Sequence, residues 1–271
     1  MEYKELCTGG KIPVLGLGTW TVGGGMSPNH AKDGNYLEII RHAVALGYTH
    51  IDTAEMYGGG HTEELVGSAL DNFPRDKLFI TTKIWHSHLR KEQVIHAIDG
   101  SLKRLKMDYI DLYLIHWPSS QVAMDDTFEG LNRLIQQGKV RNLGISNFNL
   151  EQMQLAQEVS GTPIITNQVP YSLTNRRYHE NGVLEYCQRK GILLTAYTPF
   201  DRGAVLRNKR VQQMAQKYGV TPAQIGLHWL IRQPSVITIP MSADPDHLTA
   251  NLGALNLQIT PEDESKLDQL R

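Results

Sequence analysis

Residues 78–116, LFITTKIWHSHLRKEQVIHAIDGSLKRLKMDYIDLYLIH, place an amphipathic stretch between two short apolar runs. After Arg90, apolar or small side chains recur at the spacing of one helix face: Val94, Ala97, Ile98, Ser101, Leu102 and Leu105. The runs LFITTK (78–83) and YIDLYLIH (109–116) lack the alternation of a half-exposed strand, which indicates burial on both faces. Two such strands joined by a helix predict a βαβ unit of a parallel sheet.

The same alternation of apolar runs and amphipathic stretches extends over the whole chain. Six further apolar runs are VLGLG (14–18), THID (49–52), NLGIS (142–146), IITNQ (164–168), ILLTAY (192–197) and SVITIP (235–240). Further helices are predicted at 35–46, 62–70, 126–137, 149–159, 178–190, 208–218, 222–232, 245–253 and 260–270. Asn35, Thr221 before Pro222, and Thr260 before Pro261 are candidate helix caps.

Eight buried strands alternating with helices predict an α/β fold, a closed (β/α)₈ TIM barrel. We expect one domain over residues 1–271, with an N-terminal hairpin and helices beyond the eight that a barrel needs. An open doubly wound sheet is the alternative, but its glycine fingerprint is incomplete. Thr21 follows Gly16 and Gly18 where a third glycine is needed, and Glu63 follows Gly58 and Gly60. These glycines are therefore interpreted as turn residues.

Composition narrows the class of protein. The 27 basic and 28 acidic residues nearly cancel and form no basic stripe, so we expect neither nucleic acid nor membrane as a partner. No stretch of about 18 apolar residues is present, and the N-terminus lacks the apolar segment of a signal peptide. Cys7 and Cys187 are far apart, which favours a reducing, cytoplasmic setting over a disulfide framework.

Three consecutive strands end in groups that can carry chemistry. THID ends in Asp52, LFITTK ends in Lys83 and YIDLYLIH ends in His116, while Tyr57 follows Asp52 by five residues. In a barrel, the carboxyl ends of the strands form the active-site mouth. Each residue alone has an ordinary structural explanation as a turn cap, a snorkelling lysine, a core histidine or a loop aromatic. Burying all four side chains together costs free energy unless they form hydrogen bonds or ion pairs with one another.

Together these four residues predict a proton donor for carbonyl reduction. A lysine cation beside the Tyr57 oxygen is expected to lower the pKa of the phenol, so that Tyr57 acts as general acid. Asp52 would keep Lys83 charged and in place. His116 would hydrogen-bond the substrate oxygen, where negative charge develops as hydride arrives.

Two other functions stay open at this point. His86-Ser87-His88 at a strand end is typical of metal-dependent barrel hydrolases, although no set of further ligands follows and Lys83 is a poor neighbour for a cation. We therefore assign no metal-binding residues. A non-catalytic, nicotinamide-binding regulatory barrel is the second alternative.

The ordered motifs resemble those of the aldo-keto reductase family over nearly the whole chain. They are GLGTW (16–20), IDTAEMYGGG (51–60), TTKIW (81–85), DLYLIHWP (111–118), GKVRNLGISNF (138–148), TNQVPYS (166–172), AYTPFDRG (196–203) and IPMS (239–242). The resemblance implies a reversible, NAD(P)H-dependent reduction of aldehydes and ketones, with Asp52, Tyr57, Lys83 and His116 as the catalytic residues. It also implies that Ser146, Asn147 and Gln168 hold the nicotinamide carboxamide and that Tyr197 stacks on the ring.

Further cofactor contacts implied by the resemblance are Gly18, Thr19, Trp20, Asp52, Thr198, Pro199, Phe200, Ser242, His247 and Asn251. Many NADPH-using relatives carry a lysine and an arginine where this chain has Met241 and His247. The Met241 thioether cannot form an ion pair with phosphate, and a neutral His247 imidazole forms only a weak contact. Charge-assisted contacts to a 2′-phosphate are therefore lost unless backbone donors or Arg202 replace them. The cofactor is therefore predicted as NADPH or NADH.

The resemblance implies a substrate site lined by Trp20, Tyr57, Trp85, His116 and Trp117, with Phe200 as a further candidate. Because helix 260–270 is not followed by a long enclosing loop, we expect open access and small substrates: 2-oxoaldehydes, diketones and aromatic aldehydes. We expect a monomer or a weak oligomer.

Overall fold

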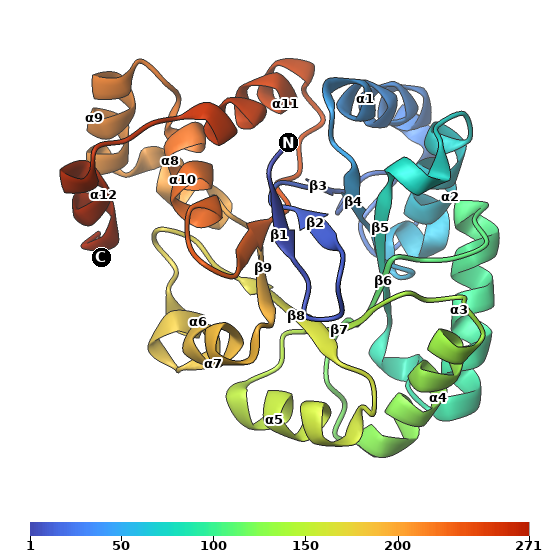
Figure 1. Ribbon diagram of the computed structural model, residues 1–271. Helices are drawn as coiled ribbons and strands as arrows, with labels where there is room; N and C mark the ends of the chain where they lie inside the picture. The colour runs from blue at the N-terminus through green and yellow to red at the C-terminus, as the bar shows by residue number, and fades with distance from the viewer. Residues whose placement is uncertain (271) are drawn as a thin grey trace.

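The computed structural model describes residues 1–270 and shows a single-domain (β/α)₈ barrel (Figure 1). Within these residues, eight parallel strands are paired in sequence order. They are β3 (Leu17–Gly18), β4 (His50–Asp52), β5 (Phe79–Ile84), β6 (Leu112–Ile115), β7 (Leu143–Ser146), β8 (Ile164–Pro170), β9 (Leu193–Tyr197) and β10 (Val236–Thr238). The parallel sheet predicted from the apolar runs is confirmed.

The first and last strands close the ring. Gly16 N donates to Thr238 O at 2.9 Å, and Thr238 N donates to Val14 O at 2.9 Å. Gly18 N donates to Pro240 O at 3.0 Å. Gly18 permits this approach, because a Cβ there would lie 2.7 Å from Ile239 O. Closure leaves the sheet without an unpaired edge and directs all the strand carboxyl ends to one mouth.

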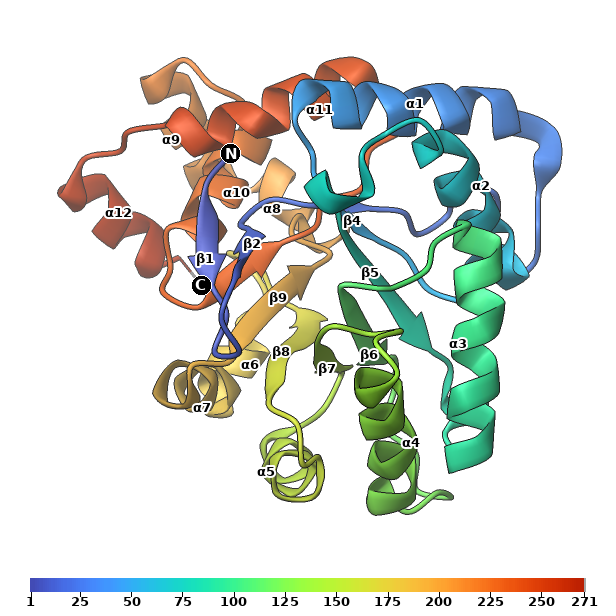
Figure 2. The same ribbon diagram turned by 45° about the vertical axis from the view of Figure 1, so that its right-hand side comes forward.

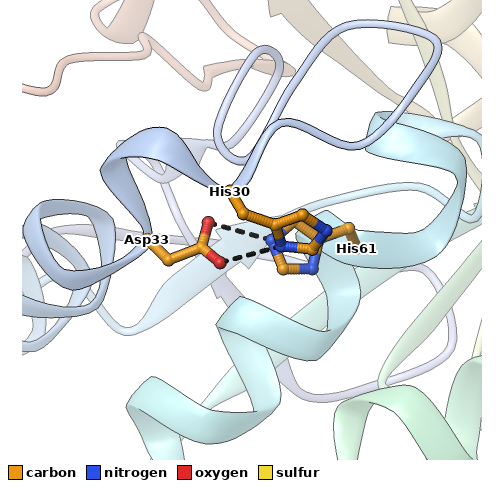
Figure 3. Close-up of side chains that lie close together, drawn as sticks. All are labelled: His30, Asp33 and His61. Atoms are coloured by element: carbon orange, nitrogen blue, oxygen red, sulfur yellow. Dashed lines mark hydrogen bonds and ion pairs between the residues drawn. The ribbon is translucent and has the colours of Figure 1, made fainter.

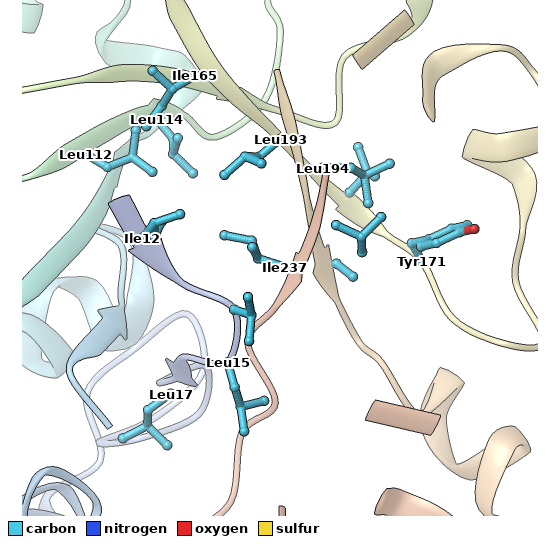
Figure 4. Close-up of a cluster of buried hydrophobic side chains, with 14 of the residues drawn as sticks. Ile12, Leu15, Leu17, Leu112, Leu114, Ile165, Tyr171, Leu193, Leu194 and Ile237 are labelled. Atoms are coloured by element: carbon cyan, nitrogen blue, oxygen red, sulfur yellow. The ribbon is translucent and has the colours of Figure 1, made fainter. Parts of the chain in front are cut away.

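The opposite end of the barrel is covered by an antiparallel hairpin of β1 (Tyr3–Glu5) and β2 (Lys11–Pro13). Ile12 of this hairpin is fully buried and points into the same apolar cluster as Leu112, Leu193 and Ile237 (Figure 4). The hairpin therefore seals the amino-terminal end of the barrel, as the expected N-terminal hairpin would, and leaves the other end free for function.

Helices surround the barrel (Figures 1 and 2). They are α1 (Asp33–Leu46), α2 (His61–Leu70), α3 (Lys91–Leu105), α4 (Met124–Gln136), α5 (Leu150–Val159), α6 (Arg177–Glu180), α7 (Val183–Lys190), α8 (Ala204–Arg207), α9 (Lys209–Tyr218), α10 (Pro222–Ile231), α11 (Pro245–Leu252) and α12 (Pro261–Asp268). Short 3₁₀ turns are η1 (His30–Lys32), η2 (Tyr57–Gly60), η3 (Arg75–Lys77), η4 (His86–His88), η5 (Asp201–Gly203) and η6 (Gly253–Asn256). Among residues 1–270, no helix has both the length and the apolar character that crossing a membrane requires.

Most predicted helix boundaries agree with the structure, and two predictions need correction. Thr221 and Thr260 cap α10 and α12 as expected. Asn35 does not cap a helix, because α1 already begins at Asp33. The single helix predicted over 178–190 is two helices, since Gly182 adopts φ of 82° and interrupts the helical backbone between α6 and α7.

Candidate active site

The four predicted catalytic residues lie together at the mouth of the barrel. Asp52 is the last residue of β4, Lys83 lies near the end of β5, and His116 directly follows β6. Because these strands are neighbours in a parallel sheet, their carboxyl ends meet on one side. Tyr57 reaches the same place from the turn that follows β4.

Lys83 is the centre of the group. Its Nζ donates to Asp52 Oδ1 at 2.5 Å, to Thr53 O at 2.8 Å and to the Tyr57 hydroxyl at 3.2 Å. The Lys83 side chain is fully buried and Asp52 is 1% exposed. Burial opposes the charge of the ammonium, but Asp52 and Tyr57 outweigh it and raise the pKa of Lys83. The lysine is therefore a cation held against the phenol oxygen.

Tyr57 is placed by the glycine-rich turn η2. Gly58, Gly59 and Gly60 adopt φ of 57°, 61° and 99°, which confirms their interpretation as turn glycines. The same interpretation is wrong for Gly18, which lies in strand β3. Gly58 N donates to Gly25 O at 2.7 Å, and a Cβ at Gly58 would lie 3.0 Å from Gly23 O. The close approach of the two loops fixes the tyrosine beside Lys83.

Lys83 acts on the pKa of Tyr57 in the predicted direction, but the net pKa shift is upward. Burial raises the pKa of the Tyr57 phenol, and the nearby charge and hydrogen bond of Lys83 only offset part of that effect. The sequence gives the charge of Lys83 but not the depth of burial. A raised pKa means that the phenol carries its proton at neutral pH, with the Lys83 ammonium 3.2 Å from its oxygen.

His116 is a neutral hydrogen-bond donor in this site. Burial first, and then the charges of Lys83 and His86, lower the pKa of His116 to about 2. In the part of the chain that the structure describes, its Nδ1 is buried without a hydrogen-bond partner. A proton on Nδ1 would leave a buried donor unsatisfied, so the proton belongs on Nε2. The ring, 5.7 Å between centroids from Tyr57, can therefore donate to a substrate oxygen.

A hydrogen-bonded chain connects the catalytic group to the predicted cofactor residues. Gln168 Nε2 donates to Asp52 Oδ2 at 2.7 Å, and Ser146 Oγ donates to Gln168 O at 2.8 Å. Asn147 Nδ2 donates to Ser146 Oγ at 3.0 Å, and its Oδ1 accepts from the Tyr197 hydroxyl at 2.8 Å. The amide and hydroxyl groups of β7 and β8 and the Tyr197 ring thus form one fixed surface suited to a carboxamide and an aromatic ring.

Strained backbone conformations occur in the loops at the same barrel mouth. Five non-glycine residues with positive φ lie in loops that follow barrel strands: Thr21, Asn147, Thr198, Asp201 and Arg202. Such conformations cost roughly 1–3 kcal/mol each and cluster at functional sites. The loop Thr198–Pro199–Phe200, predicted to contact the cofactor, directly follows Tyr197 at the end of β9.

Two of the predicted tryptophans contact the catalytic group. Trp20 packs edge-on to Tyr57 at 4.9 Å between ring centroids, and Trp85 packs against His116 at 5.2 Å. Trp20 is 42% exposed, so part of its ring contacts solvent. Trp117 is 43% exposed, and no ring contact within residues 1–270 joins it to the catalytic residues. Thr19 lies beneath this surface, where its hydroxyl donates to Asp52 O at 2.9 Å.

The predicted phosphate end lies in the loop before α11 and on α11. Met241 and His247 are exposed, whereas Asn251 is buried on α11. Ser242 Oγ accepts from Asp244 N at 3.1 Å, and Asp244 accepts from the amides of Asp246 and His247 as the helix cap. Carboxylates therefore occupy the helix amino terminus that would otherwise attract an anion.

Two supporting residues were missed from the sequence. Glu55, nearly buried, accepts from Trp85 N and pairs with His88 Nδ1 at 3.0 Å, which fixes the loop behind Trp85. Thr53 supplies a carbonyl to Lys83. Glu55 and Thr53 stand within the motif IDTAEMYGGG, so their position after β4 was the available signal.

The pair His86 and His88, considered above as metal ligands, lies in the turn η4. His88 faces Glu55, and the ring of His86 packs against Trp85 at 4.5 Å between centroids. Within residues 1–270, neither belongs to a group of three or more side chains placed to bind one metal ion.

Comparisons with known proteins agree with this geometry. The aldo/keto reductase family model matches residues 14–271. The chain is 35% identical to the methylglyoxal reductase YeaE of Escherichia coli K12, covering 99% of this chain and 95% of that protein. It is 34% identical to the glyoxal reductase of Bacillus subtilis 168, covering 99% of this chain and 92% of that protein.

Solved structures give the same result. The thermostable aldo-keto reductase Tm1743, crystallised with the inhibitor epalrestat, has a TM-score of 0.97 and 41% identity, with both chains covered completely. An aldo/keto reductase from Klebsiella pneumoniae, in complex with NADP and acetate, has a TM-score of 0.89 and 34% identity, covering 98% of this chain and 93% of that chain. The chain therefore belongs to the aldo/keto reductase family and is an oxidoreductase that reduces carbonyl groups with NAD(P)H.

Proposed function

We propose that this enzyme reduces small 2-oxoaldehydes and related carbonyl compounds, with Tyr57 as the proton donor. The observation that carries the assignment is the buried contact of Lys83 Nζ with both Asp52 (2.5 Å) and the Tyr57 hydroxyl (3.2 Å). NAD(P)H supplies the hydride when it is bound. Tyr57 then gives its hydroxyl proton to the carbonyl oxygen, and Lys83 stabilises the phenolate that remains.

His116 orients the carbonyl in this proposal. Its Nε2 proton donates to the substrate oxygen, so that two donors, His116 and Tyr57, converge where negative charge develops. Because the imidazole is neutral, it stabilises this charge without itself changing protonation state. Asp52 is a positioning residue that keeps Lys83 charged.

The carboxamide of the cofactor is assigned to Ser146, Asn147 and Gln168. The hydrogen bonds that join these side chains fix their orientation before any ligand binds. The Tyr197 hydroxyl is anchored on Asn147, which holds the aromatic ring at the end of β9. Such a ring can cover one face of a nicotinamide and leave the other face toward Tyr57.

Small substrates fit the half-open aromatic rim. Trp20 and Trp85 contact the catalytic residues, and relatives with 35% and 34% identity are named methylglyoxal reductase and glyoxal reductase. We expect the purified enzyme to oxidise NAD(P)H with methylglyoxal at a kcat in the common enzyme range of about 1–10³ s⁻¹. The rate of absorbance loss measures it, with a steroid ketone as the bulky comparison.

A kcat below about 10⁻² s⁻¹ with every carbonyl tried would instead favour the regulatory, cofactor-binding barrel. Efficient turnover of the steroid ketone alone would contradict the assignment to small substrates. Cofactor binding followed by fluorescence separates these outcomes from a failure to fold.

We also propose that NADH is an effective cofactor. Asp244 and Asp246 stand at the start of α11, beside the exposed Met241 and His247 that replace the cationic residues of many relatives. Two carboxylates near this place disfavour an additional phosphate, and no cationic side chain at positions 241 and 247 offsets them.

The double substitution Met241→Lys and His247→Arg is expected to tighten NADPH binding by about tenfold or more, because hydrogen bonds to charged groups contribute roughly 1.5–3 kcal/mol. NADH binding should change little. Leu155→Lys adds a positive charge at an exposed position on α5 and is the matched control. Equal tightening for NADH and NADPH, or for the control, would show that only net charge was changed.

We propose the cytoplasm as the compartment of this enzyme. Cys7 and Cys187 are both free thiols, as expected in a reducing setting. Burial raises the pKa of Cys187 to about 12, so that thiol is protonated and unreactive.

A further inference from the structure

Two histidines and one aspartate converge outside the catalytic site. His30 lies in the turn η1, Asp33 is the first residue of α1 and His61 is the first residue of α2 (Figure 3). His30 Nδ1 is 3.1 Å from Asp33 Oδ2, and His61 Nε2 is 2.9 Å from Asp33 Oδ1. One potential ligand atom from each residue lies within 4.8 Å of the others.

We propose that His30, Asp33 and His61 form a Zn²⁺ site that fastens the loop of residues 19–32 to the start of α2. Imidazole nitrogen and carboxylate oxygen are the ligands that zinc prefers besides thiolate. Tetrahedral coordination with bonds of about 2.0–2.1 Å separates the ligand atoms by roughly 3.4 Å. The three ligand atoms here already lie within 4.8 Å of one another. Three protein ligands leave the fourth position to water.

Glu64 provides an orienting partner for one ligand. His61 Nδ1 is 3.1 Å from Glu64 Oε2, so the nitrogen opposite the proposed metal-binding atom already faces a carboxylate. Metal-binding histidines commonly have such a carboxylate, which fixes the tautomer and increases the basicity of the ligand nitrogen. The imidazoles of His30 and His61 also lie only 4.1 Å apart between centroids, so a small movement brings both to one ion.

The exposure of the three side chains permits entry of an ion. The His30 side chain is 68% exposed and that of Asp33 is 28% exposed, whereas His61 is 10% exposed. An imidazole binds zinc only when the ligand nitrogen is unprotonated, so binding is expected to strengthen as the pH rises.

The site would stabilise a loop that contributes to the active site. The segment 19–32 carries Trp20. It is tied to the start of α2 by the bond from Thr62 Oγ1 to Val22 O and to the turn η2 by the bond from Gly58 N to Gly25 O. His61 directly follows that turn. A zinc ion that joins His30 to His61 therefore adds a third fastening between the same two segments.

Isothermal titration of the chelator-treated enzyme with ZnCl₂, without substrate or cofactor, tests the site. We expect one equivalent to bind and the Tm to rise with zinc concentration. His30→Ala and Asp33→Asn should each weaken binding by at least tenfold, and Glu64→Gln should weaken it by about 10–100-fold. An anomalous difference map from zinc-soaked crystals should place the ion between the three ligands.

Two exposed histidines provide matched controls. His42→Ala removes an imidazole from α1 outside the cluster, and His88→Ala tests the pair His86 and His88. Both variants should bind zinc as the unchanged enzyme does. The proposal is overturned by an absence of saturable binding, by binding that survives both His30→Ala and Asp33→Asn, or by loss of binding in His88→Ala. Because His30 is exposed, its variant should fold normally, and circular dichroism checks this.

Discussion

Replacing Tyr57 by phenylalanine is expected to lower kcat for carbonyl reduction by at least about a hundredfold, since general acid catalysis contributes roughly 10²–10⁴-fold. The substitution removes one oxygen and keeps the ring, including its packing against Trp20 at 4.9 Å between centroids. Cofactor affinity should stay nearly constant, because the carboxamide surface of Ser146, Asn147 and Gln168 is untouched. Steady-state kinetics and cofactor fluorescence titration measure the two quantities.

The control for this experiment is Tyr218→Phe, which removes a hydroxyl at the end of α9. That hydroxyl donates to Asp263 Oδ2 at 2.7 Å on the side of the molecule formed by α9 and α12. Its loss should leave kcat unchanged. Retention of more than a tenth of the activity in Tyr57→Phe would contradict the assignment of Tyr57 as proton donor and direct attention to His116 or to water.

Contacts between residues that lie close in sequence or on neighbouring strands could be predicted. Asp52, Lys83 and His116 end consecutive strands, and in a parallel barrel that order alone brings their side chains together. The apolar runs place the strands, and Tyr57 follows Asp52 closely enough to share its position. The apolar sequence pattern, together with the rule that parallel strands end at the same mouth, was therefore sufficient to predict the core of the site.

Contacts that depend on the folded surroundings could not be predicted in the same way. The hydrogen bond from Gln168 to Asp52 joins residues 116 positions apart and crosses the barrel mouth, so only the closed ring reveals it. The pKa direction of Tyr57 depends on burial, which the sequence does not give. The cluster of His30, Asp33 and His61 depends on how a loop folds back on α2, and no periodic pattern encodes that path.

The ion pair of Lys83 and Asp52 should determine stability as well as activity. Lys83→Met leaves the Asp52 carboxylate buried without its cation, and breaking one side of a buried pair costs about 3–5 kcal/mol in the free energy of unfolding. Urea denaturation at pH 7 measures the loss. Activity should fall as well, because the Tyr57 phenolate loses the charge that stabilises it.

The pH dependence of Lys83→Met gives a sharper test. Burial raises the pKa of Asp52, and in the variant the ammonium no longer opposes that effect. A carboxyl group whose folded pKa exceeds its unfolded value of about 3.9 stabilises the fold below that value and loses the contribution as the pH rises through the folded pKa. The variant should therefore be closest in stability to the unchanged enzyme near pH 4 and weakest above neutrality.

The double variant Asp52→Asn with Lys83→Met separates charge from packing. Replacing both charged groups by neutral side chains removes the uncompensated carboxylate, so this protein should be more stable at pH 7 than Lys83→Met alone. Its stability should also lose the pH dependence just described, while its activity stays low. If the double variant is no more stable than the single one, the loss arises from the bonds that Lys83 makes to Thr53 O and the Tyr57 hydroxyl, and the charge of Asp52 is not the cause.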